Sequence, residues 1–185
     1  MALINVGDRL PPHCLTGVRP GVDESEAFVD IDINSFEGKW KIFVFYPKDF
    51  TFICPTEIKA FDSLHEEWEK RDTVVLFGNT DNEYCKIAFK ASHPDLQNMK
   101  SWMFADLPRM GSSPLCHSVG AYDYSWGHCT RTTLLVDPNG VVQFVQAVPT
   151  QIGRGTEEVL RVLDALQTGE MCACDRPVGG DTMKL

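Results

Sequence analysis

The sequence lacks several features that mark whole classes of proteins. It has no uncharged apolar run of the roughly 18 residues that a membrane helix needs, and no basic start followed by an apolar stretch, as export signals have. It has no basic block with interleaved aromatics. Its 17 Lys and Arg are outnumbered by 26 Asp and Glu, which gives a net charge of -9. From the first two absences we expect a soluble cytoplasmic protein. The negative charge repels phosphate, so we expect binding to neither nucleic acid nor anionic membranes.

The cysteines also lack the spacing of a disulfide framework or a zinc site. Their number is odd, which favours reduced thiols, some of them reactive. The histidines and cysteines of the middle segment do not follow metal-ligand spacing either, so no metal site is expected. The seven cysteines are Cys14, Cys54, Cys85, Cys116, Cys129, Cys172 and Cys174, and the histidines of that segment are His93, His117 and His128.

The first half of the chain alternates predicted strands and helices. With 185 residues the chain suits one sizeable core, so we expect a single domain. Residues 41–47 (KIFVFYP) and 73–80 (TVVLFGNT) are apolar, branched or aromatic runs that predict buried strands. Residues 55–72 carry apolar side chains at helical spacing, and 82–92 predict a second helix. This order favours parallel pairing of the two strands.

The second half predicts a hairpin and a final helix. Asn139 and Gly140 interrupt an apolar stretch, 131–148, as the turn of a β-hairpin does. Residues 155–169 place Val and Leu side chains on one helical face and end at glycine. The whole order is that of an α/β, thioredoxin-like sandwich.

The end of the chain has a different composition. Residues 169–185 are rich in Gly, Pro and polar side chains, so we interpret them as a mobile C-terminal arm. The domain itself then spans residues 1–168.

Cys54 stands where a predicted strand gives way to a helix. Pro55 suits the first turn of that helix, so the thiol lies at the helix start, where free backbone N–H groups and the helix dipole favour a thiolate. Most intracellular cysteines are small buried hydrophobes, but two neighbours favour a nucleophile here. Thr51 offers a hydroxyl to the thiolate, and Pro47 ends the strand without adding a competing donor.

These residues form the pattern P-x-x-x-T-x-x-C, here PKDFTFIC at residues 47–54. The pattern resembles the active-site signature of the peroxiredoxins. Three further blocks are similar to those of the typical two-cysteine peroxiredoxins, in particular the catalytic subunit of bacterial alkyl hydroperoxide reductase, and the paired C-A-C is similar to its actinobacterial branch. The blocks are CPTE at 54–57, RTTLLVDPNG at 131–140 and GRGTEEVLRVLDALQTGEMC at 153–172.

The resemblance implies a thioredoxin-like fold with a peroxiredoxin N-terminal extension, and a thiol peroxidase activity. It implies that Cys54 attacks hydrogen peroxide or an organic hydroperoxide and becomes a sulfenic acid. Arg131 matches the family's active-site arginine and would stabilise the thiolate and the polarised peroxide. Glu57 would orient an arginine, and Arg154 is a weaker candidate for the same polar network.

The resemblance also implies how the enzyme recovers. The segment GEMC matches the block before the resolving cysteine, so Cys172 is the expected partner of Cys54, with Cys174 as a second candidate. An external dithiol protein would reduce the disulfide, and no metal, flavin or nucleotide is needed. The family implies an antiparallel homodimer, usually gathered into a ring of five dimers.

Several interpretations stay open at this point. Tyr46 is expected in the core with its hydroxyl toward the site, and Cys14, Cys85 and Cys129 are interpreted as structural. For Phe50 and Phe52 the interpretations compete: they pack in the core, they form a hydrophobic collar for alkyl hydroperoxides, or they make a dimer contact.

The sequence also allows two other functions to be compared with a peroxidase. One is a ring-forming chaperone or redox-signalling scaffold, whose client binding would survive Cys54→Ser. The other, a thioredoxin-type oxidoreductase, is disfavoured because the helix start lacks a C-x-x-C pair.

Overall fold

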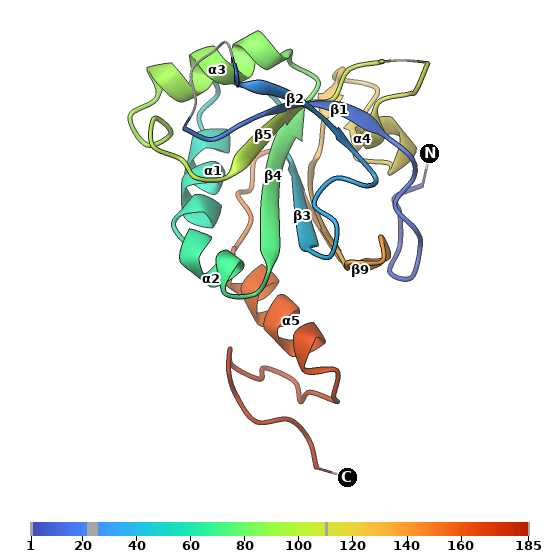
Figure 1. The fold of residues 1–185 in the computed structure, drawn as a ribbon. Helices are drawn as coiled ribbons and strands as arrows, with labels where there is room; N and C mark the ends of the chain where they lie inside the picture. The colour runs from blue at the N-terminus through green and yellow to red at the C-terminus, as the bar shows by residue number, and fades with distance from the viewer. Residues whose placement is uncertain (1, 22–25, 110, 185) are drawn as a thin grey trace.

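A computed structural model describes residues 2–21, 26–109 and 111–184, and its centre is a seven-stranded sheet (Figure 1). The strand order in the sheet is β2-β1-β5-β4-β3-β8-β9, and β6 and β7 form a separate small hairpin. The strands are β1 (Cys14–Val18), β2 (Phe28–Asp32), β3 (Trp40–Phe45), β4 (Thr73–Asn79), β5 (Trp102–Ala105), β6 (Tyr122–Asp123), β7 (His128–Cys129), β8 (Arg131–Val136) and β9 (Val142–Val148).

Helices cover both faces of this sheet. They are α1 (Cys54–Asp62), α2 (His65–Glu69), α3 (Glu83–Ser92), α4 (Leu115–Ser118) and α5 (Glu157–Thr168). The side chains of β3 alternate between the two faces, as the two-residue period of a strand requires. Ile42 and Val44 join the core cluster of α1, α2, α3 and α5, whereas Phe43 and Phe45 join the cluster that contains α4.

The predicted strand pairings are confirmed. β3 and β4 are parallel, with Phe45 opposite Gly78. β8 and β9 form an antiparallel hairpin, and Gly140 in its turn has a φ of 79°, a conformation that glycine adopts without strain. The final helix α5 also ends at glycine, since Gly169 has a φ of 67°. The α/β sandwich expected from the sequence is therefore the observed architecture.

The single helix expected over residues 55–72 is wrong, because the chain forms α1 and α2 with a break at Ser63 and Leu64. The indole N–H of Trp68 donates to the carbonyl oxygen of Phe61 over 2.8 Å. In an unbroken helix that oxygen would accept from the amide of residue 65 instead. The rings of Phe61 and Trp68 stack at 6.2 Å between centroids, so the apolar face predicted by the spacing is kept across the break.

The sequence patterns did not resolve the middle of the chain or the strands of the N-terminal extension. β1 and β2 pair antiparallel and join the sheet through β5. The middle segment contributes β5, the short α4 and the β6–β7 hairpin. Among the described residues, no helix is both long enough and apolar enough to cross a bilayer.

Candidate active site

The sheet topology brings three chain segments together at one end of β3. Because β3 and β8 are antiparallel, with Phe45 opposite Thr132, the end of β3 lies beside the start of β8. Because β8 and β9 are antiparallel, with Arg131 opposite Val148, the segment after β9 reaches the same place. The loop after β3 leads directly into α1, so Cys54 and Arg131 become neighbours although 77 positions separate them.

Cys54 is the first residue of α1 and is fully buried. Its sulfur has two polar neighbours. The Thr51 hydroxyl oxygen lies 2.9 Å from Sγ, and Arg131 Nη1 lies 3.5 Å from it. Pro47 is buried at the end of β3. Thr51 and Arg131, both singled out from the sequence, therefore meet at the sulfur of Cys54.

The Thr51 hydroxyl sits between two acceptors. Its oxygen lies 3.0 Å from the carbonyl oxygen of Lys48 and 2.9 Å from Cys54 Sγ. A hydroxyl carries a single hydrogen, so it can donate to the carbonyl while Cys54 is a thiol and turn to the sulfur once Cys54 is a thiolate. Phe50, just before Thr51, has a φ of 55°, a left-handed conformation that is rare for an aromatic residue. This turn directs the hydroxyl back toward Cys54.

Glu57 binds two arginines, one of which, Arg131, also reaches the sulfur. Its carboxylate accepts from Arg131 Nη1 at 2.6 Å, and from Arg154 Nε at 2.8 Å and Nη2 at 3.0 Å. Arg131 is further fixed by its Nε, which donates to the carbonyl oxygen of Thr150 over 2.7 Å. Burial alone would raise the pKa of Glu57, but the hydrogen bonds and charge of Arg154, with the charge of Arg131, outweigh burial and lower it. Glu57 therefore stays ionised and keeps Arg131 in place.

The arrangement suits nucleophilic chemistry at sulfur. A thiolate at the start of a helix is stabilised by the free N–H groups and the dipole of that helix. A hydroxyl and a guanidinium stand beside the sulfur, where they can also donate to a bound oxygen atom on which charge develops. Both donors are held before any ligand arrives.

A second buried network surrounds Asp49, which lies in the loop between β3 and Cys54. The sequence patterns did not predict this network. Asp49 and Lys86 form an ion pair whose side chains are 2% and 0% exposed. Tyr46, whose hydroxyl was expected to face the site, donates to Asp49 over 2.7 Å. One signal was present in the sequence, because Lys86 lies one turn before Phe89 on the apolar side of α3. A lysine is rarely buried without a charged partner.

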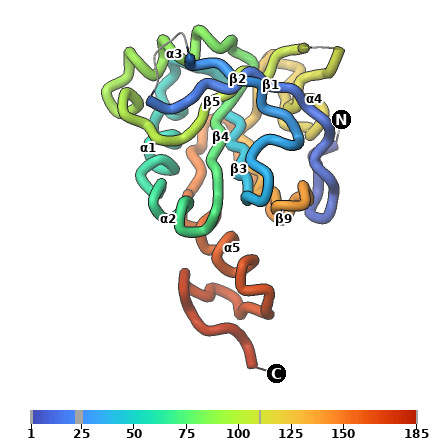
Figure 2. Tube along the Cα trace, viewed as in Figure 1, coloured from blue at the N-terminus to red at the C-terminus, as the bar shows by residue number. Residues whose placement is uncertain are grey.

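The other predicted site residues lie on the C-terminal arm, beyond α5 (Figure 2). Cys172 is half-buried against the last turn of α5, with its sulfur 3.6 Å from the Thr168 hydroxyl and 3.9 Å from the Ala165 carbonyl oxygen. Cys174 is exposed. Within the described residues, Cys172 has no polar contact with the loop that carries Cys54. In this conformation of the chain both thiols are free and Cys172 lies against α5.

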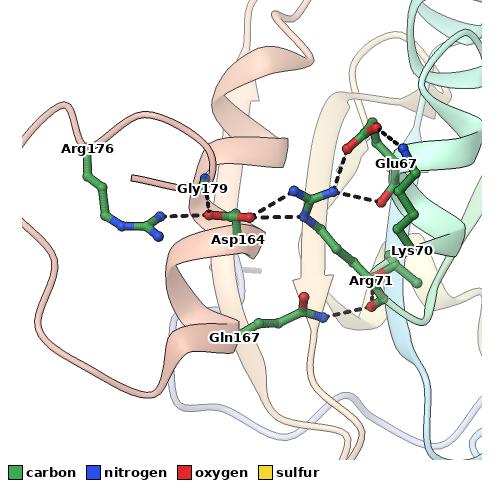
Figure 3. A network of polar contacts seen from close by, with 8 residues as sticks. Glu67, Lys70, Arg71, Asp164, Gln167, Arg176 and Gly179 are labelled. Atoms are coloured by element: carbon green, nitrogen blue, oxygen red, sulfur yellow. Dashed lines mark hydrogen bonds and ion pairs between the residues drawn. The ribbon is translucent and has the colours of Figure 1, made fainter. Parts of the chain in front are cut away.

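Asp164 on α5 fixes the arm to the domain (Figure 3). One carboxylate oxygen accepts from Arg176 Nη1 at 2.7 Å and from the Gly179 amide at 2.9 Å. The other accepts from Arg71 Nη2 at 2.8 Å, and Arg71 also pairs with Glu67 on α2. Although burial opposes it, the Gly179 amide, Arg176 and Arg71 lower the pKa of Asp164 to about 2. The arm is thus held by a carboxylate that is ionised at neutral pH.

Among the described residues, no cluster of three or more His, Cys, Asp or Glu side chains is arranged to hold a metal ion. His117 instead lies against Tyr122, with ring centroids 4.1 Å apart. Cys116 on α4 and Cys129 on β7 are buried in the same core cluster.

Known proteins resemble this chain in sequence and in fold. A model of the AhpC/TSA family matches residues 6–145. Alkyl hydroperoxide reductase C of Mycolicibacterium smegmatis is 43% identical over 190 residues, which cover 99% of this chain and 95% of that protein. The structure of Mycobacterium tuberculosis AhpC, 40% identical, gives a TM-score of 0.83 and covers 93% of this chain and 98% of its own. The structure of reduced Plasmodium vivax 2-Cys peroxiredoxin, 27% identical, gives a TM-score of 0.84 and covers 97% of this chain and 92% of its own.

The likeness extends over nearly the whole chain and includes the fold, so it does not rest on one motif. The chain therefore belongs to the AhpC/TSA family, and it is a peroxiredoxin, an enzyme that reduces peroxides with electrons from thiols.

Proposed function

We propose that Cys54 is the residue that attacks the hydroperoxide. The observation that carries this proposal is the pair of donors at its sulfur, the Thr51 hydroxyl at 2.9 Å and Arg131 Nη1 at 3.5 Å. No other cysteine among the described residues combines a helix start with two such donors. Hydrogen peroxide and organic hydroperoxides are the substrates we assign to it.

The first step forms an S–O bond and breaks the O–O bond. The Cys54 thiolate attacks one peroxide oxygen, and the other oxygen leaves with the bonding electrons and takes a proton, so that water or an alcohol is released. Thr51 and Arg131 stabilise the thiolate and the developing negative charge on oxygen. Glu57 and Arg154 keep the guanidinium of Arg131 directed at the sulfur. Pro47 shields the loop side of the sulfur from water.

The second step uses the arm at residues 169–185. The Cys172 thiol attacks the Cys54 sulfenic acid, which gives a disulfide and one water molecule. Cys174, two residues further along the exposed arm, is a second resolving candidate. Because Cys54 is fully buried, its sulfur must become accessible, so the first turn of α1 has to open for this step. An external dithiol protein then donates two electrons and restores both thiols.

We further propose that the arm reaches the Cys54 of a second copy. The polar contacts of Cys172 are with α5 and the arm of its own chain, which supports a partner in another subunit. Phe50 and Phe52 next to the site are 58% and 95% exposed and would be covered by such a contact. The assembly we assign is an antiparallel dimer that gathers into a ring of five dimers, in the cytoplasm. The net charge of -9 supports the absence of nucleic-acid or membrane partners.

The experiment that tests this function is stopped-flow mixing of the reduced protein with substoichiometric hydrogen peroxide. The products are then separated on a non-reducing gel for wild type, Cys54→Ser, Cys172→Ser and, as a matched control, Cys85→Ser. We expect rapid peroxide loss in wild type and Cys85→Ser and none in Cys54→Ser. We also expect a disulfide-linked band that Cys172→Ser weakens or reroutes to Cys174. Peroxide loss that is independent of Cys54 would refute the assignment.

A further inference from the structure

The buried pair of Asp49 and Lys86 has no part in the chemistry proposed above. Lys86 Nζ lies 2.9 Å and 3.1 Å from the two oxygens of the Asp49 carboxylate. It also hydrogen-bonds to the side-chain oxygen of Asn79 and lies 5.4 Å from the ring centre of Tyr46. Removing two charges from water is unfavourable, and an apolar pair of the same volume often stabilises a core at least as well. Stability alone therefore does not explain why Asp49 and Lys86 are buried as an ion pair.

One residue of the Cys54 loop, Asp49, is hydrogen-bonded to four other residues of the network. Besides Lys86, the Asp49 carboxylate accepts from the Tyr46 hydroxyl at 2.7 Å and from Asn79 Nδ2 at 3.1 Å. The backbone amide of Asp49 donates to the Asp81 carboxylate over 2.7 Å. The partners come from the end of β3, the end of β4, the turn that follows β4, and α3. Asp49 is thus held from several sides, two residues before Thr51.

Helix α3 touches the same loop at a second point. Phe89, one turn after Lys86 on the same side of α3, lies against Phe50 with ring centroids 5.2 Å apart. Phe50 is the residue in the left-handed conformation. A sparsely populated backbone conformation persists only where its surroundings hold it. Lys86 and Phe89 therefore hold the two residues that set the direction of Thr51.

We propose that Lys86 is a positioning residue for peroxide reduction: through Asp49 it fixes the loop so that the Thr51 hydroxyl stays directed at Cys54. Lys86 does not touch the sulfur or the substrate. The inference rests on the proposed role of Cys54. Helix α3 thereby influences the rate of peroxide reduction, although the two polar neighbours of the sulfur, Thr51 and Arg131, lie outside it.

The test compares two reactions of Cys54 in the full-length reduced protein. Reduction of hydrogen peroxide needs the aligned Thr51 and Arg131, whereas alkylation by iodoacetamide needs only an accessible thiolate. The variants are Lys86→Met and the double variant Asp49→Asn/Lys86→Met, which leaves no uncompensated buried charge and keeps the test open if Lys86→Met fails to fold. Ile87→Ala, which weakens the packing of α3 without touching the network, is the matched control.

We expect the ratio of the peroxide rate constant to the alkylation rate constant to fall about ten- to hundredfold in the Lys86 variants, since small misplacements of catalytic groups have effects of this size. Ile87→Ala should keep the wild-type ratio. A folded double variant with the wild-type peroxide rate constant would overturn the proposal. The peroxide rate constant decides beside the ratio, because a loop that merely exposed the buried Cys54 to iodoacetamide would also lower the ratio.

Amide hydrogen exchange at residues 48–53 separates this inference from the proposed function. If wild-type Cys54 consumed no peroxide, its assignment as the attacking residue would fail. The exchange rates at 48–53 would then still decide whether Lys86 fixes the loop. Faster exchange at 48–53 in the double variant than in Ile87→Ala would support the proposal. Equal exchange would refute it.

Discussion

At the scale of single residues, the site is a set of groups with fixed partners around one sulfur. The Thr51 hydroxyl can donate its one hydrogen either to the Lys48 carbonyl oxygen or to the Cys54 sulfur. Arg131 is bound by the Thr150 carbonyl oxygen and by Glu57. Because these donors are already in place, little reorganisation is required when charge develops on the peroxide.

Thr51→Val keeps the shape of the side chain and removes the hydroxyl. Hydrogen bonds to charged groups contribute about 1.5–3 kcal/mol, so we expect the rate constant of Cys54 with hydrogen peroxide to fall about ten- to hundredfold. Thr51→Ser, which keeps the hydroxyl, should retain most of the rate. Competition against a peroxidase of known rate measures both variants. A wild-type rate in Thr51→Val would show that the hydroxyl takes no part.

Glu57→Gln removes the charge between two buried guanidinium groups. Breaking a buried ion pair lowers the free energy of unfolding by roughly 3–5 kcal/mol. The pKa of Glu57 is lower in the folded than in the unfolded chain, so its contribution is complete above the ordinary value of 4.5 and is lost as pH falls through the lowered value. The stability gap between wild type and Glu57→Gln should therefore be constant from neutral pH down to about 4.5 and narrow as pH falls further.

Urea unfolding at a series of pH values measures this gap, with Glu157→Gln at the solvent-facing start of α5 as the control. A gap that widened on acidification would contradict the ionised state of Glu57.

At the scale of elements, α5 links the domain to the arm. Val159 and Leu163 bury one side of α5 in the core, and Asp164 faces both the arm and Arg71. One helix thus anchors the chain segment that carries both resolving candidates. The strength of this anchor should influence how readily the arm leaves its own domain.

Asp164→Asn should release the arm. We expect the half-buried Cys172 of the reduced protein to be alkylated about tenfold faster at neutral pH, because bonds from two arginines and one amide to a carboxylate are weakened together. Asp181→Asn, which changes an exposed carboxylate of the arm, is the matched control. Mass spectrometry of the alkylated peptide gives the rate. Equal rates in the two variants would mean that Asp164 does not hold the arm.

The same anchor should respond to acid in wild type. Since the pKa of Asp164 is lowered to about 2 from 3.8, its contribution is complete above 3.8 and is lost as pH falls toward 2.

At the scale of the whole molecule, the arm and the Cys54 loop lie in different parts of one chain. In Figures 1 and 2 the arm extends beyond α5, away from the sheet. A disulfide between Cys54 and Cys172 therefore requires either a large movement of the arm or a second subunit.

Mixing Cys54→Ser with Cys172→Ser/Cys174→Ser distinguishes these routes. After subunit exchange, a mixed dimer contains one intact pair if the disulfide forms between chains, and none if it forms within a chain. We expect a disulfide-linked dimer on a non-reducing gel in the mixture after peroxide treatment, and none in either variant alone. A wild-type protein that oxidises to a monomer with an internal disulfide would contradict the inter-chain route.

The sequence by itself determined the features that depend on near neighbours in the chain. Pro55 placed Cys54 at a helix start, the spacing of Pro47, Thr51 and Cys54 predicted that it is the nucleophile, and the apolar runs predicted the β3–β4 pair and the β8–β9 hairpin. Such patterns are readable because strand period, helix period and turn residues act locally.

Only the tertiary structure decided the contacts between distant segments. Lys86 meets Asp49 across 37 positions, Arg154 meets Glu57 across 97, and the Trp68 indole breaks a helix that the spacing predicted as continuous. The physical reason is that a buried polar group must find a partner, and folding of the sheet determines which distant groups come within hydrogen-bond distance. The sequence thus singled out Cys54, and the packing around its sulfur selected the groups that hold its loop and Arg131 in place.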